Sequence, residues 1–213
     1  GSHAGVSVGP DGGTHQAIED IALMRVLPRM TVLVPCDAFE AKKATLAAVE
    51  YPGPVYIRLA REKTPIITTG DTPFEIGKAQ IFFEPKRGIK KQVGIIACGA
   101  LVHNALLAAK SLEEEKIGVS VLNLATIKLL DHDGIIAFAK KHKAIVTVEE
   151  HQIAGGMGSA VAELLAQKYP LPMEFIGVQD QFGQSGTPDE LIKRYGLDAG
   201  SIRKVAISLF NRI

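Results

Sequence analysis

The alternation of short apolar strands with amphipathic helices constrains the fold of this chain more than any other feature. From residue 93 onward, apolar runs rich in β-branched residues predict strands at 93–97, 119–122, 144–148 and 173–178. Helical patterns between and after them predict helices at 101–116, 131–141, 159–168 and 199–211, and another that starts at Thr187-Pro188-Asp189-Glu190. Strands that alternate with helices form a parallel sheet covered on both faces. The second part of the chain is therefore predicted to be a complete three-layer α/β sandwich.

The first 66 residues show the same alternation but contain only two expected strands, at 30–35 and 55–59. A helix capped by Asp37 is expected between them and runs to about Glu50. Two strands are fewer than a layered domain normally needs, so residues 1–66 are interpreted as a partial α/β domain and the chain as a fragment. Residues 67–73 are predicted to be a linker, and residues 74–213 the second domain. The segments 74–83 and 93–97, which flank a basic turn, predict a hairpin at its start.

The stretch from His3 to Gln16 places four glycines, a proline and three ionisable side chains before a helical pattern. Proline and glycine cannot continue a strand or helix here, and Thr14 is expected to cap a helix with apolar positions from Ile18 to Leu27. His3, Asp11 and His15 would then lie beside a tight loop that can hold a polar ligand. A simple turn is the alternative. The histidines lack the spacing of a helical metal pair, so no metal site is predicted.

Three ordered blocks of sequence resemble the transketolase family. The first is the stretch from His3 to Gln16 with the helix that follows, and the second is the run Pro54-Val55-Tyr56-Ile57-Arg58-Leu59-Ala60-Arg61. The third combines Thr147-Val148-Glu149-Glu150-His151, Gly155-Gly156-x-Gly158 and Ser185-Gly186-x-Pro188. The resemblance covers essentially the whole chain. It implies the second half of the pyrimidine-binding domain and the C-terminal domain, as in the C-terminal subunit of a split transketolase.

The resemblance also implies a function in carbohydrate metabolism. Transketolases use thiamine diphosphate to move a two-carbon ketol unit from a ketose phosphate to an aldose phosphate in the pentose phosphate pathway. His15 matches the histidine near the cofactor's aminopyrimidine and the reacting carbon, so it is implied to be catalytic and cofactor-binding. Asp11 matches the aspartate that binds a substrate hydroxyl, while His3 and Arg61 match contacts to the substrate phosphate. Arg58 is expected to support packing or an ion pair.

Several parts of the family's site have no match in this sequence. They are the glutamate that protonates the aminopyrimidine, the aromatic residues around that ring, and the metal and diphosphate site. Thiamine diphosphate and Mg²⁺ (or Ca²⁺) are therefore expected to be bound mainly by an N-terminal diphosphate-binding domain or subunit. The chain alone is expected to be inactive, and the family implies a homodimer with sugar-phosphate substrates. The alternatives are a non-catalytic assembly or dimerisation module, and a portion of a 1-deoxyxylulose-5-phosphate synthase, against which the segment 11–16 argues.

The amino terminus has a second interpretation, because Gly1-Ser2-His3 is also what a cleaved affinity tag leaves. His3 is taken as native because the resemblance begins there without a break. The glycines after His151 invite a phosphate-binding interpretation, but their order differs from G-x-G-x-x-G. A tight crossover, with a contact between subunits as a second role, is favoured.

Composition excludes several classes of partner. The net charge of +1 provides no electrostatic attraction to nucleic acid or to an anionic membrane. No apolar run approaches the roughly 20 residues of a membrane-spanning helix. Cys36 and Cys98 each follow an apolar strand-like run, which indicates buried thiols in a reducing compartment. A cytoplasmic protein is expected.

Overall fold

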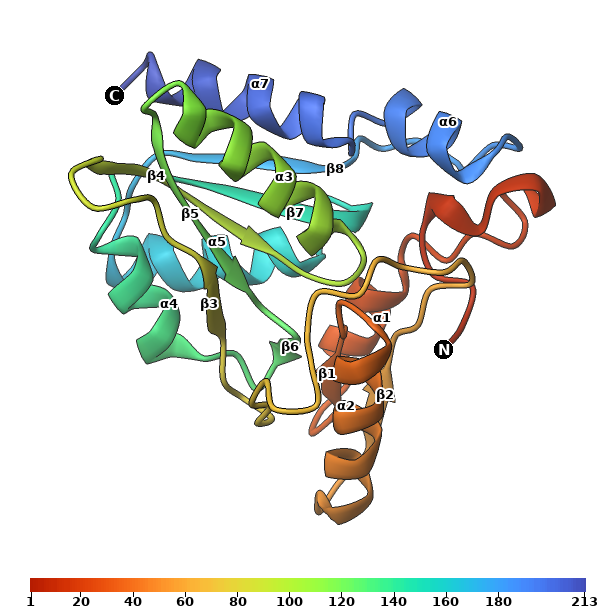
Figure 1. The fold of residues 1–213 in the computed structure, drawn as a ribbon. Coiled ribbons are helices and arrows are strands. Elements are labelled where there is room, and N and C mark those ends of the chain that lie inside the picture. The colour runs from red at the N-terminus through yellow and green to blue at the C-terminus, as the bar shows by residue number, and fades with distance from the viewer.

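The computed structural model describes residues 1–213, except for the side chain of Lys91. Its larger sheet has the order β3 (Gln80–Phe83), β5 (Gly118–Asn123), β4 (Lys91–Ala97), β7 (Ala144–Gln152) and β8 (Met173–Val178) (Figure 1). Neighbours from β5 to β8 run parallel, and only β3 is antiparallel to its partner. This is the parallel sheet that the alternation predicts.

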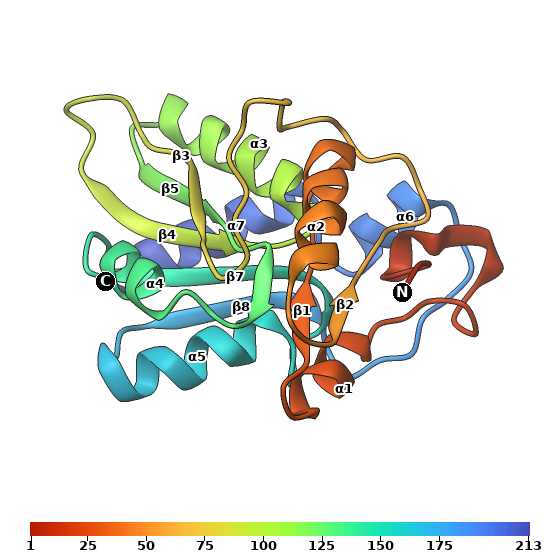
Figure 2. The ribbon, with the colours of Figure 1, turned by 90° about the horizontal axis from the view of Figure 1, so that it is seen from below.

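Helices cover both faces of this sheet. Figures 1 and 2 show α3 (Leu101–Glu114) and α7 (Ala199–Phe210) on one side, and α4 (His132–Ala139) and α5 (Met157–Lys168) on the other. The strands are buried between two apolar cores, one against α3 and α7 and one against α4 and α5. Because both faces are covered, β5 is buried at every residue and β7 at every residue but Gln152, rather than at alternate residues. The prediction of a three-layer α/β sandwich is confirmed.

A second, three-stranded sheet has the order β2 (Val55–Ile57), β1 (Thr31–Leu33), β6 (Thr126–Lys128). β1 and β2 are parallel, as expected for a partial α/β domain, and α1 (Asp20–Val26) and α2 (Ala38–Glu50) accompany them. Asp37 caps α2 by accepting the N–H of Glu40 at 2.9 Å. β6, which sequence analysis did not predict, comes from the second part of the chain and pairs antiparallel to β1. The two predicted domains thus share one sheet.

Two local predictions were wrong. No hairpin joins β3 to β4, because β4 lies inside the sheet between β5 and β7 and β3 pairs with β5 at the edge. Thr14 does not cap α1, which begins only at Asp20. The preceding chain instead forms a 3-10 segment, η1 (Val6–Asp11), that is bent at Gly9.

Other local predictions agree with the structure. The last two helices, α6 (Pro188–Arg194) and α7, begin at Pro188 and Ala199, and Thr187 and Glu190 form a capping box at α6. Cys36 and Cys98 are buried free thiols. Among the described residues, no helix is both long enough and apolar enough to cross a bilayer.

Candidate active site

The glycine-rich loop at the start of the chain is held in place by a strand of the larger sheet. The carboxylate of Glu150, in β7, accepts the backbone N–H of Ser7 at 2.6 Å. Gly5 has φ 83°, and a Cβ placed on it would lie 2.3 Å from the Glu150 carboxyl group. Glycine is therefore required at position 5 both for its backbone angle and for this close approach. Burial raises the pKa of Glu150, and the N–H of Ser7 partly opposes that rise.

Asp11 and Arg61, two of the predicted site residues, are in direct contact. An Nη of Arg61 lies 2.6 Å from a carboxylate oxygen of Asp11, and the same nitrogen donates a hydrogen bond to the carbonyl of Val8 at 3.1 Å. About a third of each side chain is exposed (37% for Arg61 and 33% for Asp11). The pair can therefore be reached by a ligand from solvent. In Figure 1 the loop with η1 and the segment after β2 lie at the same end of the molecule.

His3 and His15 lie on the two sides of the same loop. A parallel bridge joins Ala4 to Ala17, with the N–H of Ala17 donating to the His3 carbonyl at 3.1 Å. Both imidazoles are exposed. The Nδ1 of His15 is 3.0 Å from the hydroxyl of Thr14, and that of His3 is 3.0 Å from the hydroxyl of Ser2. His3 also has φ 62°, in the left-handed region that is uncommon for residues other than glycine.

Arg58 forms the ion pair that was expected of it. Its Nε donates to both carboxylate oxygens of Asp20, at 2.8 and 3.1 Å, and the Tyr56 hydroxyl donates to the same carboxylate. An Nη of Arg58 also donates to the carbonyls of Ala17 and Glu150 at 2.9 Å. Burial raises the pKa of Asp20, but the charge and hydrogen bonds of Arg58 outweigh it, and the net shift is downward. Arg58 therefore connects β2, the loop before α1, and β7.

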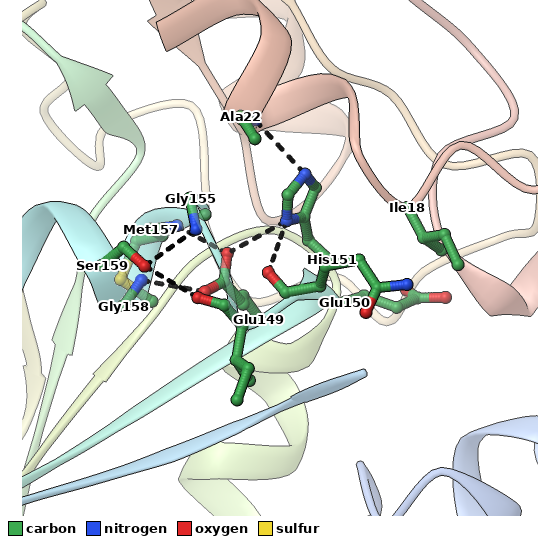
Figure 3. Close-up of polar contacts among 12 residues, drawn as sticks. Ile18, Ala22, Glu149, Glu150, His151, Gly155, Met157, Gly158 and Ser159 are labelled. Atoms are coloured by element: carbon green, nitrogen blue, oxygen red, sulfur yellow. Dashed lines mark hydrogen bonds and ion pairs between the residues drawn. The ribbon is translucent and has the colours of Figure 1, made fainter. Parts of the chain in front are cut away.

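The glycine motif at the start of α5 does not present a free anion site. The carboxylate of Glu149 accepts the N–H groups of Met157 at 2.6 Å and Gly158 at 2.8 Å (Figure 3). These are the N-terminal amides to which a phosphate would bind. Burial raises the pKa of Glu149 to about 7, although both N–H groups and nearby arginine charges favour the ionised form. The expected tight crossover fits this geometry better than a nucleotide site.

His151 is held neutral beside Glu149. Its Nδ1 is 2.7 Å from the carbonyl of Gln152, and its Nε2 is 3.3 Å from the backbone nitrogen of Ala22 in α1 (Figure 3). A carbonyl can only accept and an N–H can only donate, so the proton is on Nδ1. Burial and the charge of Arg58 lower the pKa of this imidazole. Glu149 and His151 belong to the third block of the resemblance, which implied no such contacts for them.

A cavity of about 490 Å³ lies between the segment after β2 and the ends of β1 and β4. Its wall includes Cys36, Cys98, Arg58 and Glu150, but not His3, Asp11, His15 or Arg61. Burial raises the pKa of both thiols, which keeps them protonated and unreactive. The predicted site residues thus lie outside this cavity, with His3, Asp11 and His15 on the exposed loop and Arg61 on the segment after β2.

Comparison with known proteins agrees with the sequence resemblance. Residues 83–202 match the family model for the transketolase C-terminal domain, and residues 1–66 match that for the transketolase pyrimidine binding domain. A protein of Methanocaldococcus jannaschii named as a transketolase C-terminal section is 43% identical over 206 residues, which are 95% of this chain and 63% of that protein. The 6-deoxy-6-sulfo-D-fructose transketolase subunit SqwH of Clostridium sp. strain MSTE9 is 38% identical over 100% of this chain and 64% of its own length.

A solved structure is equally similar. It is described as a split-gene transketolase, an inactive β4 tetramer, and it superposes with a TM-score of 0.89 and 41% identity over 99% of this chain and 65% of that one. The chain thus spans 63% to 65% of the lengths of these three proteins.

Proposed function

This chain belongs to the transketolase family, and we propose that it is the C-terminal part of an active thiamine-diphosphate-dependent transketolase. The proposed reaction moves a two-carbon ketol unit from a ketose phosphate to an aldose phosphate. The observation that best supports it is the contact of 2.6 Å from Arg61 to Asp11, which lies on the same loop as His15. We assign the carboxylate to a substrate hydroxyl and the guanidinium to the substrate phosphate, and the two groups would then act side by side.

The groups that this chain offers fit only part of the cofactor. Thiamine diphosphate, when bound, supplies the nucleophilic carbon and the electron sink for cleavage of the carbon–carbon bond. The described residues include the exposed imidazole of His15 but no group of three or more His, Cys, Asp or Glu that could hold a metal ion. We therefore assign contact with the aminopyrimidine to His15, and the diphosphate with Mg²⁺ or Ca²⁺ to an N-terminal domain or subunit.

His15 is proposed to exchange protons with the reacting groups. An imidazole donates and accepts protons near neutral pH, which the steps of ketol transfer require. The Thr14 hydroxyl, 3.0 Å from Nδ1, orients the ring through one nitrogen. The other nitrogen, Nε2, is the one that we assign to the substrate.

Arg61 and His3 are proposed to bind the anionic end of the substrate. A planar guanidinium pairs its N–H groups with the oxygens of a tetrahedral anion. The similar SqwH protein is named for a sugar with a sulfonate group, which supports a substrate with an anionic end. Asp11, paired with Arg61 in the free chain, is then available to accept a substrate hydroxyl.

Exposed apolar side chains support the proposal that another domain or subunit completes the active site. Large apolar side chains on α1 and α2 are exposed: Val26 is 77%, Leu46 60% and Val49 81% exposed. β2 is an edge strand of the smaller sheet, and α2 projects away from the larger one (Figure 1). We propose that an N-terminal partner covers these surfaces, within a homodimeric and cytoplasmic enzyme. The chain by itself is proposed to be inactive.

Reconstitution tests the proposal. The chain is mixed with the N-terminal section of a split transketolase, thiamine diphosphate and Mg²⁺, and is offered a panel of donors. Ketol transfer from xylulose 5-phosphate to ribose 5-phosphate supports a transketolase. Condensation of pyruvate with glyceraldehyde 3-phosphate would indicate a deoxyxylulose-phosphate synthase. Complex formation without either reaction would indicate an assembly module.

A further inference from the structure

The loop that carries Asp11 and His15 packs against a segment from the far end of the chain. This segment, residues 183–188, follows β8 and ends with the first residue of α6, and Figure 1 shows η1 beside α6. The closest approaches are at glycines. A Cβ on Gly13 would lie 2.6 Å from the carbonyl oxygen of Gly183, and a Cβ on Gly12 would lie 2.5 Å from the hydroxyl of Ser185. At Gly13 and Gly183 the two backbones therefore meet directly, whereas Gly12 meets the side chain of Ser185.

Gln16 connects the loop to the same segment. Its side chain is buried, and Nε2 donates to the carbonyls of Gln184 at 2.8 Å and Val6 at 3.1 Å, with Gly9 at 3.5 Å. Three carbonyl oxygens can only accept, so the amide nitrogen must face them and the amide cannot flip. Its oxygen points toward Gly183 and has no hydrogen-bond partner among the described residues.

Gly183 is required by this contact rather than by its own backbone. A Cβ there would lie 1.8 Å from the amide oxygen of Gln16 and 2.9 Å from the Cα of Gly13. Its φ lies outside the left-handed region, so an alanine would be allowed by the backbone. Any effect of a methyl group at position 183 would therefore come from pushing on the loop.

A displacement at Gly12 or Gly13 would reach the site residues directly. The N–H of His15 donates to the Gly12 carbonyl at 3.0 Å, and the N–H of Gly12 donates to the Gly9 carbonyl at 3.1 Å. Asp11 lies inside the second of these turns. Close-packed backbone transmits a shift rather than absorbing it.

We propose that Gly183 and Gln16 are positioning residues, through which the C-terminal domain sets the loop of Asp11 and His15 for ketol transfer. This rests on the roles proposed above for Asp11 and His15. Segment 183–188 touches neither substrate nor cofactor in this proposal. The loop packs against this segment and is held in position by it. Supporting residues of this kind hold a reactive group within a fraction of an ångström.

The test compares Gly183→Ala with Gly70→Ala. Gly70 also has φ outside the left-handed region, and a Cβ there would meet nothing within 4 Å, so it is a matched control. Carbon–proton NMR spectra of the chain resolve the ring signals of its six histidines, and His15→Gln identifies the His15 signal. Gly183→Ala is expected to move the chemical shifts of the His15 ring while those of His103 and His132 stay fixed. Gly70→Ala is expected to move none of them.

In the reconstituted enzyme, Gly183→Ala is expected to lower kcat by about 10- to 100-fold, as for a misplacement of about 1 Å, with a smaller change in KM for thiamine diphosphate. Gln16→Met, which keeps the length of the side chain but removes the donor, is expected to move the same His15 signal and serves if Gly183→Ala does not fold. An unchanged His15 signal in a folded Gly183→Ala or Gln16→Met chain would overturn the proposal. Because the NMR measurement needs no turnover, it decides the positioning role even if reconstitution shows no transferase activity.

Discussion

Two arginines that follow β2, only three positions apart, hold aspartates in opposite surroundings. Arg58 pairs with Asp20 where 5% and 12% of the side chains are exposed, and it also donates to two backbone carbonyls. Arg61 pairs with Asp11 where 37% and 33% are exposed, and it donates to one carbonyl. The first pair is largely buried, whereas the second faces solvent.

The difference in burial indicates different roles for the two pairs. A buried charge that loses its partner costs several kcal/mol, so the fold depends on an intact pair between Arg58 and Asp20. An exposed ion pair contributes between 0 and about 1 kcal/mol, so a stronger anion can displace Asp11 from Arg61 at little cost. The same chemistry therefore serves assembly in one place and ligand exchange in the other.

The largest expected effect comes from breaking the buried pair. Arg58→Met should lower the free energy of unfolding by about 3–5 kcal/mol, because Asp20 would remain buried without its counter-charge. Denaturant unfolding with circular dichroism measures this. Arg203→Met, which breaks an exposed pair with Glu115, is the control and should cost less than about 1 kcal/mol. Equal effects in the two variants would contradict the comparison.

Breaking the exposed pair should affect substrate binding and leave stability nearly unchanged. Arg61→Ala should change the free energy of unfolding by less than about 1 kcal/mol. In the reconstituted enzyme it should raise KM for sugar phosphates by about 10- to 100-fold, because charge-assisted hydrogen bonds contribute roughly 1.5–3 kcal/mol. Steady-state kinetics with phosphorylated and unphosphorylated donors measures this. A similar rise in KM for both donors would exclude a phosphate contact.

Glu149, which is buried and interacts with the charge of Arg58, should make the stability of the chain depend on pH. The pKa of Glu149 is raised to about 7, so between its ordinary value and 7 the folded chain keeps a proton that the unfolded chain releases. Stability from this group is therefore present at low pH and is lost as pH rises toward 7, with a slope of up to about 1.4 kcal/mol per pH unit. The pKa of His151 is lowered. Its contribution to the free energy of unfolding is lost as pH falls, so it has the opposite pH dependence to that of Glu149.

The substitution Glu149→Gln separates the contribution of Glu149 from that of His151. The difference in unfolding free energy between wild type and Glu149→Gln, measured from pH 5 to 8, should fall with rising pH. Parallel curves would mean that Glu149 is ionised throughout that range.

The smallest expected effect concerns the anion affinity of the free chain. Asp11→Asn should release Arg61 and tighten binding of inorganic phosphate about fivefold, which corresponds to the roughly 1 kcal/mol of an exposed pair. Titration calorimetry or NMR measures this, and Arg61→Ala should abolish the gain. Asp71→Asn, in the predicted linker, is the control. Equal phosphate affinity in wild type and Asp11→Asn would show that Asp11 does not compete for Arg61.

The features that sequence predicted are those that neighbouring residues determine. Asp37 caps α2, and the Thr187–Glu190 box starts α6, because each cap acts within three residues. The pairing of β3 with β5 instead of β4, and the three-residue strand β6, depend on partners far along the chain. Apolar periodicity identifies a strand but not its neighbour.

The candidate site likewise contains residues that the sequence indicated and residues that depend on long-range contacts. The resemblance pointed to Asp11 and Arg61, and the structure brings these two together. The contributions of Gln16 and Gly183 depend on contacts between residues 167 positions apart in sequence, which no local pattern reveals. The burial of Glu149 and Glu150 was likewise hidden, because the sequence shows the charges but not what covers them.

The most direct test of the account is the rate of ketol transfer from xylulose 5-phosphate to ribose 5-phosphate, measured for the chain alone and with an N-terminal diphosphate-binding partner. We predict no turnover by the chain alone with thiamine diphosphate and Mg²⁺, turnover when the partner is added, and its loss again in the His15→Gln complex. Turnover by the chain alone, or an active His15→Gln complex, would contradict the account.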